Sequence, residues 1–278
     1  MTDMPSTGEP SRNRQKKEGA RMQDIEVKFT EKPELKDPIF IEGLPGVGNV
    51  GKLAAEHLID QLKAVKFADI ISKFFPPQVI VKDDGLIHLV SNEMYYVKRK
   101  DKDNDIVFLV GDYQGVTPEG QYMLSDLVLS IVRELGVTKI FTLGGYGIGK
   151  MVEKPRVLGA ATDLDLVDEM KELGVVFSKG EPGSGIVGAS GLLLGLGKLY
   201  GMHSVCLMGE TSGYFVDPRA AEVVLEVLVK RLDVQIDYEA LRHKAQQIDQ
   251  ITARLKDMET PQVPEATGER REDLGYIG

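Results

Sequence analysis

The glycine-rich segment at residues 43–52 constrains the fold of this chain more than any other feature. A short apolar run at residues 38–41 precedes it, and residues 53–59 carry apolar side chains at helical spacing. The local order is therefore strand, tight turn, helix. Because this unit builds sheets that are covered by helices, it predicts an α/β layer fold.

Two nucleotide-binding signatures overlap in this segment. Gly46-x-Gly48-x-x-Gly51 matches the dinucleotide fingerprint. Gly46-x-x-x-x-Gly51-Lys52 matches a P-loop up to its last position, where Leu53 replaces the Ser or Thr that holds magnesium. A dinucleotide site also needs an acidic residue at the end of a strand about 20 residues further on. Asp69 instead falls inside a predicted strand at residues 65–71.

The same glycines have a structural interpretation, in which they permit a tight turn and close contact between helix and strand. The fingerprint recurs at residues 183–188, and residues 144–149 are also glycine-rich. Since the chain holds 30 glycines, each match has low specificity. The packing interpretation is favoured, and a ligand site at the carboxyl ends of the strands stays open.

Strand-like and helix-like segments alternate along the rest of the chain. Continuous apolar runs predict strands covered on both faces, and strict alternation at residues 25–29 predicts an edge strand. The buried strands are expected at residues 106–110, 139–143 and 204–208, shorter strands at 157–161 and 175–177, and an antiparallel hairpin region at 78–97. Helices are expected to begin at the caps Thr117, Asp163 and Asp217 and after the glycine loop at 180–188. The predicted fold class is α/β, with a mostly parallel sheet flanked by helices, an antiparallel hairpin region, and a C-terminal helix followed by a flexible tail.

Composition divides the chain into four parts. Residues 1–21 are polar and predict a disordered leader, because they cannot bury enough apolar surface to offset ordering. Residues 22–235 form the predicted α/β core domain, and residues 236–258 a C-terminal helix. Residues 259–278 read as a flexible tail with an apolar tip.

The predicted C-terminal helix carries an apolar seam. Leu241, Ile248 and Leu255 lie seven residues apart, and Ile251 lies between the last two. A narrow seam on an otherwise charged helix is typical of helices that pair with one another. We therefore expect a homo-oligomer that associates through these four residues.

Charge and composition exclude several classes. A net charge of -9 argues against a general nucleic-acid binder. No apolar run approaches the length of a membrane span, and the N-terminus shows no apolar signal segment. Cys206 is the single cysteine, which excludes a disulfide within the chain and indicates a reducing compartment. A cytoplasmic protein with no nucleic-acid or membrane partner is expected.

No residue pattern predicts catalysis. The chain lacks a G-x-S-x-G elbow and metal-ligand pairs such as H-x-x-H or C-x-x-C, and none of its four histidines falls at the end of a predicted strand. Glu42 and Glu210 follow apolar strands and could face a crevice, although solvated carboxylates are the commoner outcome. We therefore expect no catalytic residue, cofactor or metal ligand. The alternative is a nucleotide- or nucleoside-binding α/β enzyme, ATP-grasp-like or phosphorylase-like, that uses the glycine loops.

Three glycine segments carry a resemblance to a known family. Residues 43–51, the run Gly144-Gly145-Tyr146 and the loop at 180–191 resemble the proteasome assembly chaperone family, especially its archaeal members. The resemblance spans about residues 36–232. It implies a fold similar to nucleoside phosphorylases without their active site, a homo-oligomer, and a role in assembly of the proteasome core particle through binding of its α-subunits.

The resemblance also directs attention to the last residues of the chain. Some members of the family end in a hydrophobic-Tyr-any tripeptide that enters pockets between α-subunits. This chain ends in Tyr276-Ile277-Gly278, so its tyrosine is third from last rather than second. A shifted version of the same docking is expected, with Leu274, Tyr276, Ile277 and the terminal carboxylate of Gly278 as contacts.

Overall fold

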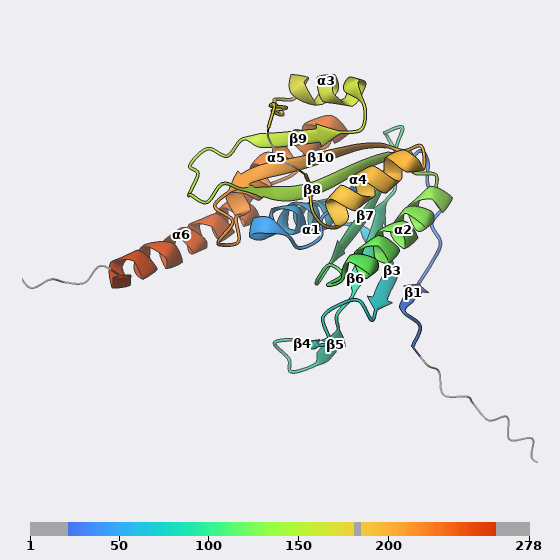
Figure 1. Ribbon diagram of the computed structural model, residues 1–278, viewed down its shortest axis with the longest axis horizontal. Helices are drawn as coiled ribbons and strands as arrows, with labels where there is room; N and C mark the ends of the chain where they lie inside the picture. Colours follow the sequence, from blue (N-terminus) through green and yellow to red (C-terminus); the bar gives the residue numbers. More distant parts are fainter. Residues whose placement is uncertain (1–21, 181–184, 260–278) are drawn as a thin grey trace, which may run out of the picture.

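The computed structural model describes residues 22–180 and 185–259 and contains one large mixed sheet (Figure 1). Its strand order is β1-β3-β6-β7-β2-β8-β10-β9. The four central strands, β7, β2, β8 and β10, run parallel, and antiparallel strands complete both edges. The predicted fold class is confirmed. The strands are β1 (Ile25–Phe29), β2 (Ile39–Glu42), β3 (Val65–Ser72), β6 (Asn92–Val97), β7 (Ile106–Gly111), β8 (Lys139–Gly147), β9 (Val157–Ala161) and β10 (His203–Thr211).

Helices cover both faces of the sheet. α1 (Val50–Leu62), α3 (Leu164–Glu172) and α5 (Pro218–Leu232) pack on one face, where they form a core with the inward side chains of the parallel strands. α2 (Pro118–Glu134) and α4 (Ala189–Leu199) pack on the other face. A separate hairpin, β4 (Val79–Val81) with β5 (Ile87–Leu89), joins β3 to β6. α6 (Glu239–Glu259) packs on α5 and then runs away from the body (Figure 1).

Three predicted strands differ clearly from the structure, the first being β10, which is expected at 204–208 and spans His203–Thr211. β8 does not end at residue 143 but continues through the glycines to Gly147, in parallel register with β10. A side chain on Gly145 would lie 2.2 Å from the carbonyl oxygen of Val47, so glycine is what lets the strand pass beneath the turn before α1. The strand expected at 175–177 contributes only a single bridge, between Val176 and Leu158.

The predicted helix caps are confirmed at two of three positions. Thr117 accepts a hydrogen bond from the backbone N–H of Gly120, and Asp217 accepts one from Ala220. Asp163 makes no such bond. Its carboxylate instead accepts from the hydroxyl of Thr162 at 2.6 Å and contacts the ring of His203 at 2.9 Å. The hydroxyl of the preceding residue and the ring of His203, at the start of β10, therefore take the place of the helix N-terminus as partners of this side chain.

Candidate functional site

The glycine turn is filled by the chain's own atoms. A side chain on Gly51 would lie 2.0 Å from the carbonyl oxygen of Leu143, and one on Gly43 would lie 2.4 Å from the Cβ of Ala55. Gly48 has a φ of 63°, which favours glycine. These distances show that the glycines let α1 lie directly against β8, as the packing interpretation predicts.

The two charged side chains that a nucleotide site would use are paired with other groups of the chain. Lys52, the P-loop lysine, donates to the carbonyl oxygen of Gly111 at 2.6 Å and pairs with Glu56 at 3.2 Å. Asp69, the candidate ribose ligand, pairs with Lys66 at 2.7 Å. Both side chains line a groove of about 500 Å³ at the carboxyl end of β7. Its charges are thus largely neutralised by one another, which gives an anionic ligand little net attraction.

Glu42 is buried, contrary to the expectation of a solvated carboxylate. It is 0% exposed at the end of β2, where Oε1 accepts from the N–H of Leu44 at 2.9 Å. Its Oε2 accepts from the hydroxyl of Ser190, in the first turn of α4, also at 2.9 Å. Burial raises the pKa of Glu42 to about 7, although both hydrogen bonds oppose the rise. With no exposed surface, Glu42 ties β2 to α4 and offers nothing to a substrate.

The same expectation is wrong for Glu210. This carboxylate is 5% exposed and lies at the end of β10. Arg156 donates to it from its backbone N–H at 3.0 Å and from Nε at 2.9 Å. The hydrogen-bonded guanidinium holds the pKa of Glu210 below its usual value. The pair anchors the start of β9 to β10.

The histidines and carboxylates do not converge on a catalytic or metal site. His57 contacts the carbonyl oxygen of Asp237, His88 contacts Asp112, and His203 contacts Asp163, at three separate places. Within the described residues, no group of three or more His, Cys, Asp or Glu side chains could hold a metal ion.

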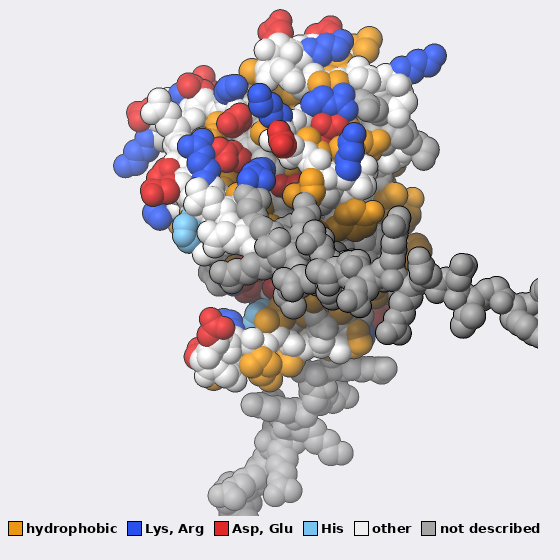
Figure 2. Space-filling model, turned by 90° about the vertical axis from the view of Figure 1, so that its left-hand side faces the viewer, with side chains coloured by type: hydrophobic (Ala, Val, Ile, Leu, Met, Phe, Trp, Pro, Cys, Tyr) orange, Lys and Arg blue, Asp and Glu red, His pale blue; other side chains and the backbone are white. Residues whose placement is uncertain are grey.

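Exposed apolar side chains gather where the parallel strands end. Tyr214, Phe215 and Val216 follow β10 as an exposed run, and Tyr214 is 74% exposed. Val47 lies beside this run and Met151 lines the same crevice as Phe215. We call these five residues the carboxyl-edge surface. Figure 2 shows hydrophobic side chains gathered on this face below a region of interspersed acidic and basic side chains.

The hairpin β4–β5 extends the apolar character of the same end. Five aliphatic side chains are exposed on it: Val79, Val81, Leu86, Ile87 and Leu89. It stands off the main sheet as a lower projection in Figure 2. A two-stranded hairpin is marginally stable by itself, and clustered exposed aliphatics mark interaction sites. β4 is an unbroken apolar run, Val79-Ile80-Val81, whereas β5 alternates as Ile87-His88-Leu89, so no common pattern in the sequence marked both strands as an exposed surface.

The first turns of α6 pack against the core, and the rest of the helix projects from the body (Figure 1). Leu241 is 1% exposed within the core of its own chain, and Ala245 is buried beside it. Leu241 therefore fixes the helix to its own subunit and is not accessible to a second copy. Ile248 lines the crevice formed by Met151 and Phe215.

The remaining predicted contacts cannot be placed in this way. The side chains of Ile251 and Leu255 and the tail residues Leu274, Tyr276, Ile277 and Gly278 lie outside the described residues. Self-association through Ile248, Ile251 and Leu255 stays a prediction. In the part of the chain that the structure describes, no helix is both long enough and apolar enough to cross a lipid bilayer.

Comparison with known proteins gives a consistent family. A model of the PAC2 family matches residues 40–256. An uncharacterized protein of Methanocaldococcus jannaschii is 40% identical over 246 residues, which cover 88% of this chain and 93% of its relative. PbaB of Pyrococcus furiosus, an archaeal proteasome activator, has a TM-score of 0.80 at 42% identity, covering 84% of this chain and 100% of PbaB. PbaA of the same organism, an archaeal homolog of proteasome-assembly chaperone, has a TM-score of 0.70 at 30% identity, covering 85% and 93%.

Proposed function

Because the chain belongs to the PAC2 family, we propose that it is a non-enzymatic cytoplasmic chaperone that assists assembly of the proteasome core particle by binding α-subunits, partly through its C-terminal tail. The descriptions of PbaB and PbaA support a proteasome partner. One structural observation carries the proposal for this chain. α6 runs away from the body at the same end that exposes the apolar hairpin and the carboxyl-edge surface.

The tail makes the first contact in this proposal. Residues 260–278 follow α6 directly and could span up to about 65 Å if fully extended, at roughly 3.3–3.6 Å per residue. Leu274, Tyr276, Ile277 and the terminal carboxylate are the docking groups. If several copies associate through the seam on α6, their tails act together, which raises effective affinity by roughly 10²–10⁴ without any new contact.

The exposed apolar surfaces make the second contact. Val81 and Ile87 on the hairpin are each 66% exposed, and Tyr214, in the loop that follows β10, is 74% exposed. Apolar surface of this kind is stabilised by burial against a partner. An unassembled α-subunit, with its own subunit interfaces still open, offers apolar surface of the matching kind.

The glycine turn and Glu42, which could have suggested enzymatic activity, do not support it. The lysine and the acid of the nucleotide signatures are bound to the chain itself, and Glu42 is enclosed. The glycine turn serves the contact between α1 and β8. The function therefore resides on the surface rather than in a cleft.

The test compares capture of purified α-subunits by three forms of the protein. In the first, residues 274–278 are intact; in the second, they are replaced by five Gly and Ser residues, which keeps the length; in the third, Val81→Asp and Ile87→Asp change the hairpin. We expect binding to fall about tenfold or more in the second form and measurably in the third. Unchanged binding in the second form would contradict docking of α-subunits by residues 274–278. Unchanged binding in all forms would reject α-subunits as the partner of this end of the molecule.

A further inference from the structure

β1 is an edge strand with one unpaired side. Among the described strands it pairs only with β3. Lys73 donates from its backbone N–H to the carbonyl oxygen of Asp24, and Thr30 donates to that of Phe67. Residues of an antiparallel strand alternate in direction, so even-numbered residues bond to β3. The backbone N–H and C=O groups of Ile25, Val27 and Phe29 therefore point outward.

The two faces of this edge differ in chemistry. Ile25 and Val27 pack against the apolar cluster beneath α2, and Phe29 stacks on Phe67 of that cluster while remaining 42% exposed. Glu26 and Lys28 lie on the opposite face, because side chains alternate along a strand. The outward edge thus presents an apolar row on one side and an acid followed by a base on the other.

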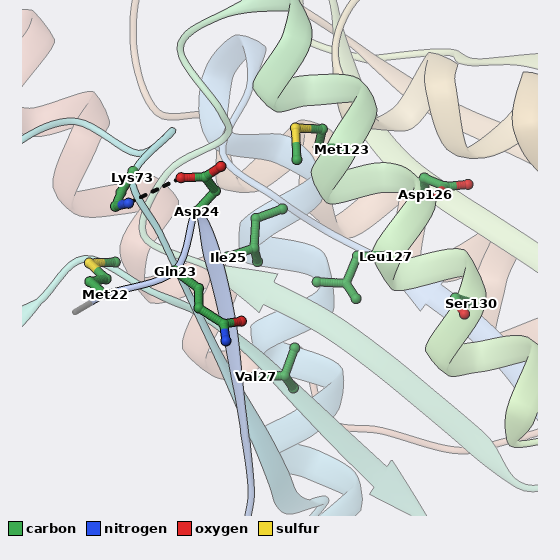
Figure 3. A pocket seen from close by; sticks show the side chains of 10 residues that line it. All are labelled: Met22, Gln23, Asp24, Ile25, Val27, Lys73, Met123, Asp126, Leu127 and Ser130. Atoms are coloured by element: carbon green, nitrogen blue, oxygen red, sulfur yellow. Dashed lines mark hydrogen bonds and ion pairs between the residues drawn. The ribbon is translucent and has the colours of Figure 1, made fainter. Parts of the chain in front are cut away.

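A groove beside the edge has room for the side chains of another strand. It has a volume of about 880 Å³ and lies between β1 and α2. Figure 3 shows Ile25 and Val27 on the strand side and Met123 and Leu127 on the helix side. Asp24 and Lys73 pair with each other at its end, at 3.1 Å. A strand with apolar residues at alternate positions fits this combination of free backbone and apolar groove.

We propose that the occupant is β1 of a second copy of this chain, paired antiparallel about a two-fold axis through Val27. In this register Val27 lies opposite Val27 and Ile25 opposite Phe29, and these outward-pointing residues form hydrogen-bonded pairs. Glu26 lies opposite Lys28 on the other face, twice, once on each side of the axis. The interface joins the two sheets into one continuous sheet, whether or not the chain serves proteasome assembly.

Charge complementarity within β1 favours a second copy and a register centred on Val27. Moving the axis by one residue keeps the hydrogen-bonding direction but places Glu26 opposite Glu26 or Lys28 opposite Lys28. Like charges directly opposite each other are destabilising, whereas opposite charges contribute roughly 0.2–1 kcal/mol per pair. Among pairs formed within residues 25–29, the charges are therefore complementary only when the pairing is centred on Val27.

A charge exchange tests the proposal. Glu26→Lys and Lys28→Glu each create two like-charge pairs across the axis, so each single variant should raise the dissociation constant of the dimer about tenfold or more. The double variant restores opposite charges and should return the constant to within about threefold of the natural chain. Analytical ultracentrifugation over a concentration series measures this. Because the predicted seam on α6 could join copies independently, the series is repeated with Ile248→Asp and Leu255→Asp present in every form.

A cross-link gives a second readout that survives a folding defect in either charge variant. Paired residues of this hydrogen-bonded type lie about 5.5 Å apart between Cα atoms, within reach of a disulfide. Val27→Cys should therefore form a covalent dimer under mild oxidation, and Leu164→Cys, exposed on α3, should not. The natural Cys206 does not interfere, because it is buried and burial raises the pKa of its thiol to about 12.

Three results would overturn the proposal. The first is that Glu26→Lys leaves the native mass and the dissociation constant unchanged and that Val27→Cys forms no cross-link. The second is a loss of association that the double variant does not restore. The third is an unchanged mass accompanied by weaker capture of a client, which would assign the edge to an extended segment of another protein.

Discussion

Protonation of Glu42 makes the stability of the fold depend on pH. Its pKa is raised by burial from 4.5 to about 7 in the folded protein, and it returns to its ordinary value on unfolding. Between these values the folded state holds a proton that the unfolded state releases. Stability is therefore full below about pH 4.5 and falls as the pH rises through 7. The shift corresponds to about 3 kcal/mol, at about 1.36 kcal/mol per pH unit.

The replacement Glu42→Gln isolates this contribution. Glutamine keeps the shape, can accept from the N–H of Leu44 and can donate to the hydroxyl of Ser190, yet it never carries the buried charge. We expect the variant and the natural chain to unfold with similar free energies at pH 5. At pH 9 the variant should be more stable by about 1–3 kcal/mol, somewhat less than the full shift, because glutamine lacks the two charge-assisted hydrogen bonds that the charged carboxylate accepts.

Urea titrations from pH 5 to pH 9 measure the difference between the two proteins, which cancels the titration of all other groups. Glu210→Gln is the matched control. Arg156 lowers the pKa of Glu210, so its contribution is lost only as the pH falls below the ordinary value. That variant should be less stable by an amount that stays constant over the same range. A difference for Glu42→Gln that does not change with pH would refute the reasoning.

Three further experiments test the packing, the seam and the absence of nucleotide binding. Gly51→Ala should lower the free energy of unfolding by several kcal/mol or prevent folding, because its methyl group would meet the carbonyl oxygen of Leu143 at 2.0 Å. Gly46→Ala, whose methyl group would have no atom within 4 Å, should change that free energy by less than about 0.5 kcal/mol, and equal values for the two variants would contradict this packing. Ile248→Asp with Leu255→Asp should lower the native mass measured by light scattering, and an unchanged mass would exclude the seam. Calorimetry with ATP, NAD and nucleosides should show no saturable heat, and saturable binding that Gly48→Val removes would instead favour a ligand site.

Much of the fold could be predicted because it is encoded locally. The buried strands are continuous apolar runs. Thr117 and Asp217 mark the starts of two helices, because each side chain accepts a hydrogen bond from the backbone N–H three residues further on. The prediction ended β8 too early because glycine is disfavoured in strands. The strand nevertheless continues, because glycine is the residue that leaves room for the turn before α1. Local patterns therefore identify an element more reliably than they identify its end.

The buried carboxylates could not be predicted because their partners are remote in sequence. Ser190 lies 148 residues from Glu42, and Arg156 lies 54 residues from Glu210. No local pattern distinguishes such a carboxylate from a solvated one. The exposed apolar surface of the hairpin was missed for the converse reason. Val81 and Ile87 read as strand residues of a sheet, and only the topology shows that their hairpin pairs with no strand of that sheet.

The two proposed interfaces make different demands on client binding. A two-fold axis through Val27 reverses the direction of the sheet, so the carboxyl edges of the two copies, with their α6 helices, point to opposite ends. A β1 dimer therefore cannot present both tails to one ring of α-subunits. Joint action of tails on one ring requires the seam on α6, where helices can run side by side. We expect Glu26→Lys to reduce the native mass while leaving α-subunit capture per chain unchanged, and Ile248→Asp with Leu255→Asp to reduce capture. If capture falls with the β1 charge variant and not with the seam variant, the tails act from a back-to-back pair and the seam has no part in multivalent binding.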